Sequence, residues 1–198
     1  MLTLFLILPL RWLNPVTTAF ILRDEHIDSV WIYQSWTPLE AIAPVSQMAV
    51  LAAEDQRFPK HYGLDFTELT KVLSHSGVPR RGASTITQQL VKNLYLWPNK
   101  GVVRKAVEAY MAMCMEVLLP KSRILELYLN VIEFGQGIYG ITDASEHYFD
   151  KLPQQLNRID ASILAAVLPN PKKMKVEAPS PYVYERWIYG LLFVIWVV

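Results

Sequence analysis

Hydrophobic residues recur three or four positions apart through most of the chain, which is the spacing of one face of an α-helix. In one segment Ile86, Leu90 and Leu94 are four residues apart, and Ser84 is placed to cap the helix that they predict. Polar residues of this segment then lie on other faces, where they are free to bind a polar ligand. These residues are Gln88, Gln89 and Lys92.

Further helices follow from the same spacing and from helix-capping residues. We expect a helix capped by Ser46 that runs to about Phe58, and a short helix that Asp65 opens and that runs through Leu73. Three more are expected over residues 102–119, 122–132 and 160–168. The helix over 102–119 is the longest and is almost wholly apolar in its second half, as a central helix is. Neither strand-like alternation of period two nor an internal repeat is evident. The predicted fold class is therefore mainly α.

Both ends of the chain are unusually apolar. Residues 1–10 are hydrophobic apart from Thr3 and Pro9, but ten helical residues reach only about 15 Å, whereas a bilayer core is about 30 Å thick. This end is either the remnant of a longer anchor or an interfacial segment with Arg11 and Trp12 at headgroup level. Residues 187–198 carry no charge and predict a buried or membrane-touching tail.

Length, charge and cysteine content narrow the classes of protein. A chain of 198 residues with 52% hydrophobic residues is long enough for one domain with a substantial core. Its net charge of +1 gives no field that would draw it to nucleic acid. The single cysteine, Cys114, lies in an apolar run, forms no intramolecular disulfide and is predicted to fill the core.

Four polar motifs follow one another between residues 54 and 130. They are Glu-Asp-x-x-Phe-x-x-His-x-Gly-x-Asp at 54–65, Gly-x-Ser-Thr-Ile-x-Gln-Gln at 82–89, Arg-Lys-x-x-Glu at 104–108 and Lys-x-x-Ile-Leu-Glu-x-Tyr-Leu-Asn at 121–130. In this order and at these spacings the chain resembles the peptidoglycan glycosyltransferase family over roughly residues 14–182. It is most similar to the single-domain, monofunctional biosynthetic form, since no transpeptidase domain follows.

The resemblance implies a lysozyme-like helical fold that polymerises lipid II into glycan strands. It also implies a single-pass anchor in the bacterial inner membrane, with the catalytic domain in the periplasm. The expected organisation is an anchor or its remnant at 1–22, a glycosyltransferase domain at 23–182 and an apolar tail at 183–198. The expected partners are lipid II, the lipid-linked nascent glycan, the inner membrane and other cell-wall synthesis proteins, and no nucleic acid.

The chemistry of this reaction requires a base at the acceptor hydroxyl and cations at the departing diphosphate. The resemblance implies that Glu54 is the general base and that Glu108 is a second catalytic glutamate. Glu108 shares a helical face with Arg104, so it would orient cations or the donor sugar. The substrate-binding residues that it implies are Asp55, Phe58, His61, Gly63, Ser84, Thr85, Gln88, Gln89, Lys92, Asn93, Lys100, Arg104 and Lys105. A divalent cation (Mg²⁺ or Mn²⁺) could help to hold the diphosphate, although no cluster of ligands demands one.

Several other interpretations of these residues stay open. Glu54 and Asp55 could be a solvated acidic pair, and Arg104 with Glu108 is also an ordinary helix salt bridge. His61 has no second ligand at metal-binding spacing, which favours a structural hydrogen bond. The glycines of residues 135–140 predict a loop that needs positive φ or close approach rather than a nucleotide site. The rival functions are a lysozyme-like glycosidase and a non-catalytic membrane scaffold of the wall-synthesis complex.

Overall fold

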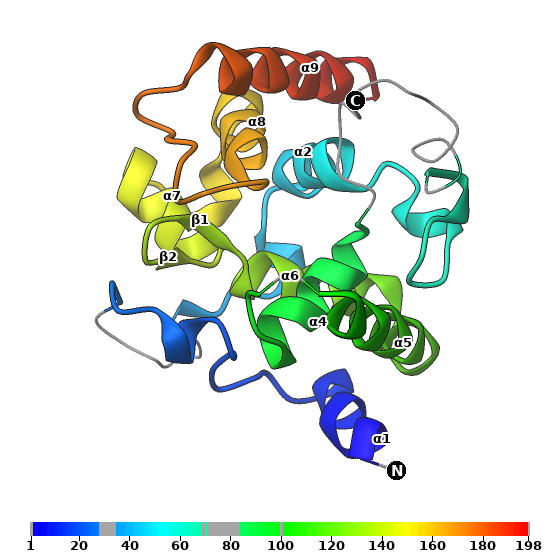
Figure 1. The fold of residues 1–198 in the computed structure, drawn as a ribbon. Coiled ribbons are helices and arrows are strands. Elements are labelled where there is room, and N and C mark those ends of the chain that lie inside the picture. The colour runs from blue at the N-terminus through cyan, green and yellow to red at the C-terminus, as the bar shows by residue number, and fades with distance from the viewer. Residues whose placement is uncertain (1, 28–34, 69, 71–83, 100, 198) are drawn as a thin grey trace.

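The computed structural model describes residues 2–27, 35–68, 70, 84–99 and 101–197, and these residues are mostly helical, as expected. Two groups of packed helices form the body of the domain (Figure 1). One contains α2 (Pro44–Glu54), α8 (Arg158–Val167) and α9 (Pro181–Val197), and the other contains α4 (Ile86–Tyr95), α5 (Val102–Leu118) and α6 (Lys121–Val131). A short hairpin of β1 (Glu133–Gly135) and β2 (Ile138–Tyr139) and helix α7 (Ile141–Phe149) lie beside both groups.

Helix α2 differs from its prediction at both ends. It begins at Pro44, a residue whose fixed φ suits the first turn of a helix, so Ser46 is buried inside the helix instead of capping it. It ends at Glu54 instead of about Phe58, because Asp55 leaves the helical conformation with φ −156° and ψ 75°. A single 3₁₀ turn, η5 (Phe58–Lys60), follows. The carboxylate of Glu54 therefore lies at the end of a helix.

The N-cap of α4 is Thr85, not Ser84. The hydroxyl of Thr85 accepts the amide hydrogen of Gln88 at 3.2 Å, and the side chain of Gln88 accepts that of Thr85 at 3.1 Å. This capping box requires a glutamine three residues after the cap, and only Thr85 has one there. Ser84 is thereby released from the helix end and is available to the site.

Strands were not expected, yet residues 133–139 form the antiparallel hairpin of β1 and β2. The strands are too short for an alternating pattern to be visible in the sequence. The prediction that glycines of residues 135–140 supply positive φ is confirmed, since Gly137 and Gly140 have φ of 76° and 84°. A side chain at Gly137 would also place its Cβ 2.4 Å from the carbonyl oxygen of His26, so the hairpin lies directly against the N-terminal segment. Helix α7, which follows, was not predicted.

The remaining predicted helices agree with the structure within a few residues. Helices α5, α6 and α8 fall over 102–118, 121–131 and 158–167. A helix opens at Asp65, as expected, and Asp65 Oδ1 accepts the amide hydrogens of Thr67 and Glu68 at 3.0 and 3.1 Å. The continuation of that helix through Leu73 lies outside the described residues. Cys114 is half-buried and packs against the core.

The two apolar ends of the chain lie on opposite sides of the molecule (Figure 1). Helix α1 (Leu2–Ile7) and the 3₁₀ turn η1 (Leu8–Arg11) pack against α5, whereas α9 packs on α8 and α2. Within the described part of the chain, no helix combines the length and the apolar character that crossing a membrane requires. Helix α9 begins at Pro181 and is continuous across residue 183, where the tail was expected to begin. The division of the chain at 22 and 182 stays a prediction.

Candidate active site

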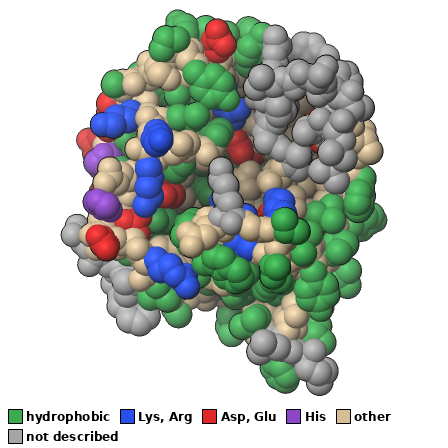
Figure 2. Space-filling view, in the orientation of Figure 1, with side chains coloured by type: hydrophobic (Ala, Val, Ile, Leu, Met, Phe, Trp, Pro, Cys, Tyr) green, Lys and Arg blue, Asp and Glu red, His purple; other side chains and the backbone are tan. Residues whose placement is uncertain are grey.

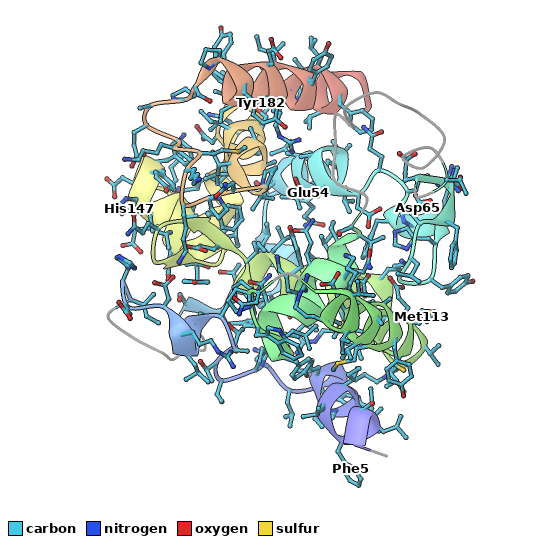
Figure 3. All side chains as sticks on the ribbon, viewed as in Figure 1. Phe5, Glu54, Asp65, Met113, His147 and Tyr182 are labelled. Carbon is cyan, nitrogen blue, oxygen red and sulfur yellow. The ribbon has the colours of Figure 1, made fainter. Side chains whose placement is uncertain are left out.

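A cavity of about 400 Å³ lies between the two groups of helices. Its walls come from the ends of α2 and α8, from the exposed turns of α4, from the start of β1 and from α9. Figure 2 shows acidic and basic side chains together in the hollow of this face, and Figure 3 labels Glu54 between α2 and the helices below it. The lining residues are Phe20, Ala53, Glu54, Ser84, Gln89, Lys92, Asn93, Ile132, Glu133, Leu168, Pro169, Pro171, Tyr182 and Arg186.

Glu54 is held in this cavity by two side chains from different helices. Gln89 of α4 donates from Nε2 to Glu54 Oε2 at 2.8 Å, and Arg186 of α9 donates from Nη2 to Glu54 Oε1 at 3.0 Å. Gln89 is itself fixed, because the hydroxyl of the fully buried Tyr128 donates to its Oε1 at 2.9 Å. The side chain of Glu54 is only 9% exposed. These contacts fix the direction in which its carboxylate points.

Sequence reasoning missed Arg186. It was expected in the apolar tail, but its side chain is 12% exposed and forms an ion pair with the glutamate at the centre of the site. Its Nε also donates to the carbonyl oxygen of Ala166 at 3.3 Å, so the guanidinium bridges α8, α9 and α2. The one signal in the sequence was a cation immediately before a run of twelve uncharged residues.

The other residues of the first motif do not line the cavity. Asp55 accepts from His61 Nε2 at 3.0 and 2.9 Å, and its Oδ2 also accepts the amide hydrogen of Ile86 at 3.0 Å. Because Ile86 is the first residue of α4, this pair ties the end of α2 to the start of α4. The expectation that His61 makes a structural hydrogen bond is confirmed. A substrate contact by Asp55 or His61 stays a prediction.

Phe58 and Gly63 shape the turn between those two helices. Phe58 is buried with its ring 6.1 Å from that of His61. Gly63 has φ 85°, and a Cβ there would lie 2.8 Å from the backbone of Ala112, so only glycine fits against α5. Its carbonyl oxygen accepts from the Thr85 hydroxyl at 2.6 Å. These residues, with Thr85 and Gln88, position the wall of the cavity without lining it.

Basic side chains gather on the α4–α5 side of the site. Lys92 lines the cavity with its ammonium 5.4 Å from the centre of the Phe20 ring. Burial lowers the pKa of Lys92, while the charge of Glu108 opposes this shift. A dianionic ligand would therefore stabilise the charged form of Lys92.

Glu108 organises the two cations of the third motif. This carboxylate is 2% exposed, and its two oxygens accept from Arg104 and Lys105 respectively. The ammonium of Lys105 reaches on to Ser84 Oγ at 2.7 Å, and Ser84 lines the cavity. Arg104 Nε is buried without a hydrogen-bond acceptor among the described residues. Lys100, the remaining predicted cation, lies outside them.

The structure thus brings together five of the residues expected at the site. These are Glu54, Ser84, Gln89, Lys92 and Asn93. Among the described residues no three His, Cys, Asp or Glu side chains lie close enough together to hold a metal ion.

A helical domain with an oriented, nearly buried carboxylate and a lysine in one cavity has the groups that glycosyl transfer from an anionic leaving group requires. Comparison with known proteins gives the family. A family model described as "Transglycosylase" matches residues 24–191. The chain belongs to the transglycosylase family and is a glycosyltransferase.

Curated relatives in this family share two fifths or more of their aligned residues with this chain. The biosynthetic peptidoglycan transglycosylase of Bdellovibrio bacteriovorus is 47% identical over 180 residues, which cover 87% of this chain and 71% of the relative. That of Aeromonas hydrophila is 48% identical over 161 residues, 79% of this chain and 68% of the relative. That of Escherichia coli is 41% identical over 192 residues, 90% of this chain and 79% of the relative.

Proposed function

We propose that this enzyme polymerises peptidoglycan glycan strands from lipid II during cell-wall synthesis, with Glu54 as the general base. The observation that carries the role of Glu54 is its position: a nearly buried carboxylate, oriented by Gln89 and Arg186, in the same cavity as Lys92. Its relatives bear the name biosynthetic peptidoglycan transglycosylase, which supports the substrate class.

In the proposed reaction Glu54 removes the proton from the 4-hydroxyl of the acceptor sugar of lipid II. The acceptor oxygen forms a bond to the anomeric carbon of the lipid-linked chain, and the bond from that carbon to the diphosphate breaks on the opposite side. The configuration is inverted and undecaprenyl diphosphate leaves with the electron pair. Gln89 fixes one oxygen of Glu54, so the other can change partner from Arg186 to the acceptor hydroxyl.

The departing diphosphate is stabilised by the cations on the opposite wall. Lys92 supplies a charge in the cavity, and the two cations held by Glu108 extend the positive region towards Ser84. Glu108 is a positioning residue in this scheme, since both of its oxygens are occupied by cations. Glycoside hydrolysis has no need of this cationic wall, which is why transfer from a diphosphate is favoured over a lysozyme-like activity.

The enzyme acts in the cell envelope, and we place its domain on the periplasmic face of the inner membrane. Support comes from the N-terminal side of the molecule, where Figure 2 shows hydrophobic side chains gathered over the lower right. Phe5 and Trp12 are 74% and 70% exposed there, and Val103 and Val117 of α5 are 74% and 80% exposed. Such a surface, together with the 1–22 segment, suits attachment next to a lipid substrate. Other cell-wall synthesis proteins are the further partners that we expect.

The test is incubation of the detergent-solubilised protein with labelled lipid II, with polymer and released undecaprenyl diphosphate as readouts. We expect polymer from the unchanged enzyme and a loss of at least about 10²-fold in Glu54→Gln, because an amide cannot accept the proton. Glu146→Gln, which alters an exposed glutamate on α7, is the matched control and should retain full activity. Near-normal turnover in Glu54→Gln would refute the base assignment. Absence of polymer from folded, unchanged enzyme would refute the function.

A further inference from the structure

The cavity contains a second carboxyl group that the proposed mechanism does not use. Glu133, the first residue of β1, lines the cavity together with Glu54, Lys92 and Arg186. It is 7% exposed and lies two residues after the end of α6 in an apolar stretch. A carboxyl group in such a stretch is costly to bury unless it has a partner or a task.

One oxygen of this carboxyl group is fixed by the protein. Glu133 Oε1 accepts the amide hydrogen of Gly137 at 3.4 Å and lies 3.7 Å from the ammonium of Lys172. Lys172 is bound in turn by Asp24 Oδ2 at 2.9 Å, and the hydroxyl of Tyr139 donates to the same oxygen at 2.7 Å. The N-terminal segment, both strands of the hairpin and the loop after α8 thus meet at this cluster.

The other oxygen has no partner among the described residues. In the described part of the chain, the hydrogen bond and the ion pair of Glu133 both go to Oε1, and the residue borders the cavity. A carboxyl oxygen next to bound substrate repels phosphate but accepts a hydrogen bond from a hydroxyl group. The wall at Glu133 therefore suits the saccharide, and the wall at Lys92 suits the diphosphate.

The carboxyl group of Glu133 changes its charge near neutral pH. Burial raises the pKa of Glu133 to about 7, against the opposing effects of the Lys172 charge and the Gly137 amide. The charged and titratable groups that face it are Lys172 from the loop after α8, Asp24 from the N-terminal segment, Tyr139 from β2 and Tyr148 from α7. Burial would raise the pKa of Asp24 too, but its bonds to Tyr139 and Lys172 hold that pKa well below the ordinary value. Asp24 thus stays ionised as the partner of Lys172.

We propose that Glu133 is a substrate-binding residue, whose unpartnered Oε2 accepts a hydrogen bond from a saccharide hydroxyl and sets the direction of the sugar in the cavity. This inference rests on the proposed function, since it concerns the substrate of that reaction. In this arrangement the wall at Glu133 binds the saccharide of the lipid-linked substrate, and the wall at Lys92 binds its diphosphate. The ionised carboxylate is the stronger acceptor, so the affinity for the saccharide rises as pH increases through about 7.

The experiment measures kcat and KM for lipid II between about pH 6 and about pH 8, the range in which such a group titrates. Glu133→Ala should raise KM about tenfold at the upper end, the worth of one charge-assisted hydrogen bond, with kcat changed less than about twofold. Glu133→Gln keeps a neutral acceptor oxygen, so part of the affinity should return while the dependence of KM on pH disappears. Glu177→Gln alters an exposed glutamate outside the cavity and should match the unchanged enzyme.

The variant Lys172→Ala distinguishes substrate binding by Glu133 from a purely structural role of Glu133. It breaks the ion pair between the two residues but leaves Glu133 Oε2 in place. Loss of this cation should move the midpoint of the pH dependence above 7, because the Lys172 charge lowers the pKa of Glu133. The inference is overturned if Glu133→Ala leaves KM unchanged, or if Lys172→Ala and Glu133→Ala raise KM equally with equal loss of melting temperature. Both results presuppose polymer from the unchanged enzyme, whose absence would instead refute the proposed function.

Discussion

The surroundings of two lysines, Lys92 and Lys172, shift their pKa values in opposite directions. Lys92 is mostly buried, and desolvation lowers the pKa of its ammonium group. Lys172, by contrast, has a raised pKa: burial opposes the shift, but its bond to Asp24 favours the charged form. An anionic ligand would therefore stabilise the charged form of Lys92, whereas the charge of Lys172 is already balanced by Asp24.

At this scale we predict that Lys92→Ala lowers kcat/KM for lipid II by about 10²-fold, since a charge that stabilises the leaving group is lost. Lys92→Arg should recover part of the rate, because the charge returns with a different shape. The measurement is initial polymerisation rate at limiting lipid II, accompanied by thermal melting. Lys173→Ala removes an exposed lysine outside the cavity and serves as control. An unchanged rate in Lys92→Ala would contradict the role in diphosphate handling.

Helix ends are the elements that build this cavity. Glu54 terminates α2, and α4 begins with the capping box of Thr85 and Gln88. Asp55 joins the two ends by accepting the amide hydrogen of Ile86. An amphipathic helix can be recognised from its spacing, but the residue at which it stops depends on which side chain binds its free amides.

The two neighbouring hydroxyl residues at the start of α4 should accordingly behave differently. Thr85→Ala removes the cap and the bond to Gly63, and should lower the free energy of unfolding by about 1–2 kcal/mol. Ser84→Ala should leave stability within about 0.5 kcal/mol and instead slow polymerisation, since Ser84 holds Lys105 at the cavity. Chemical denaturation and the lipid II assay on both variants give the comparison. Equal stability losses would argue against Thr85 as the cap.

On the scale of the whole molecule, the site is completed by the C-terminal helix. Val183 and Val194 of α9 are fully buried, and Arg186 reaches from the same helix to Glu54. The glutamate and the arginine are 132 residues apart in sequence. The site therefore requires that the first and last parts of the domain be folded against each other.

A double-mutant cycle tests this coupling. Arg186→Ala should lower the free energy of unfolding by roughly 1.5–3 kcal/mol, the cost of losing a hydrogen bond to a charged group in a buried setting. In the Glu54→Gln background the same change should cost about 1 kcal/mol or less, because the charge that Arg186 neutralises is gone. Additive effects of the two substitutions, measured by denaturant titration, would show that Arg186 acts through the backbone carbonyls of Ala53 and Ala166 and not through the charge of Glu54.

Most of the fold could be predicted from the sequence because helices depend on local spacing. The mainly α class, helices α5, α6 and α8, the start of a helix at Asp65 and the positive φ of glycines within residues 135–140 were all predicted correctly. The errors fell at the ends of α2 and α4 and at the hairpin. A proline at the start of α2 and a competing capping box at the start of α4 moved the helix ends away from the residues that the spacing indicated. Strands of two or three residues are too short to show an alternating pattern.

The sequence by itself determined the helical class of the fold, the charged residues of the motifs and the family to which the chain belongs. Motifs and helical periods can be recognised in this way because they depend on residues close together in the chain. Only the tertiary structure decided that Asp55 and His61 hold a helix end, that Arg186 pairs with Glu54, and that Glu133 shares the cavity. These contacts join segments far apart in the chain. They arise from the packing of helix faces against one another, and no pattern of adjacent residues specifies where two such faces meet.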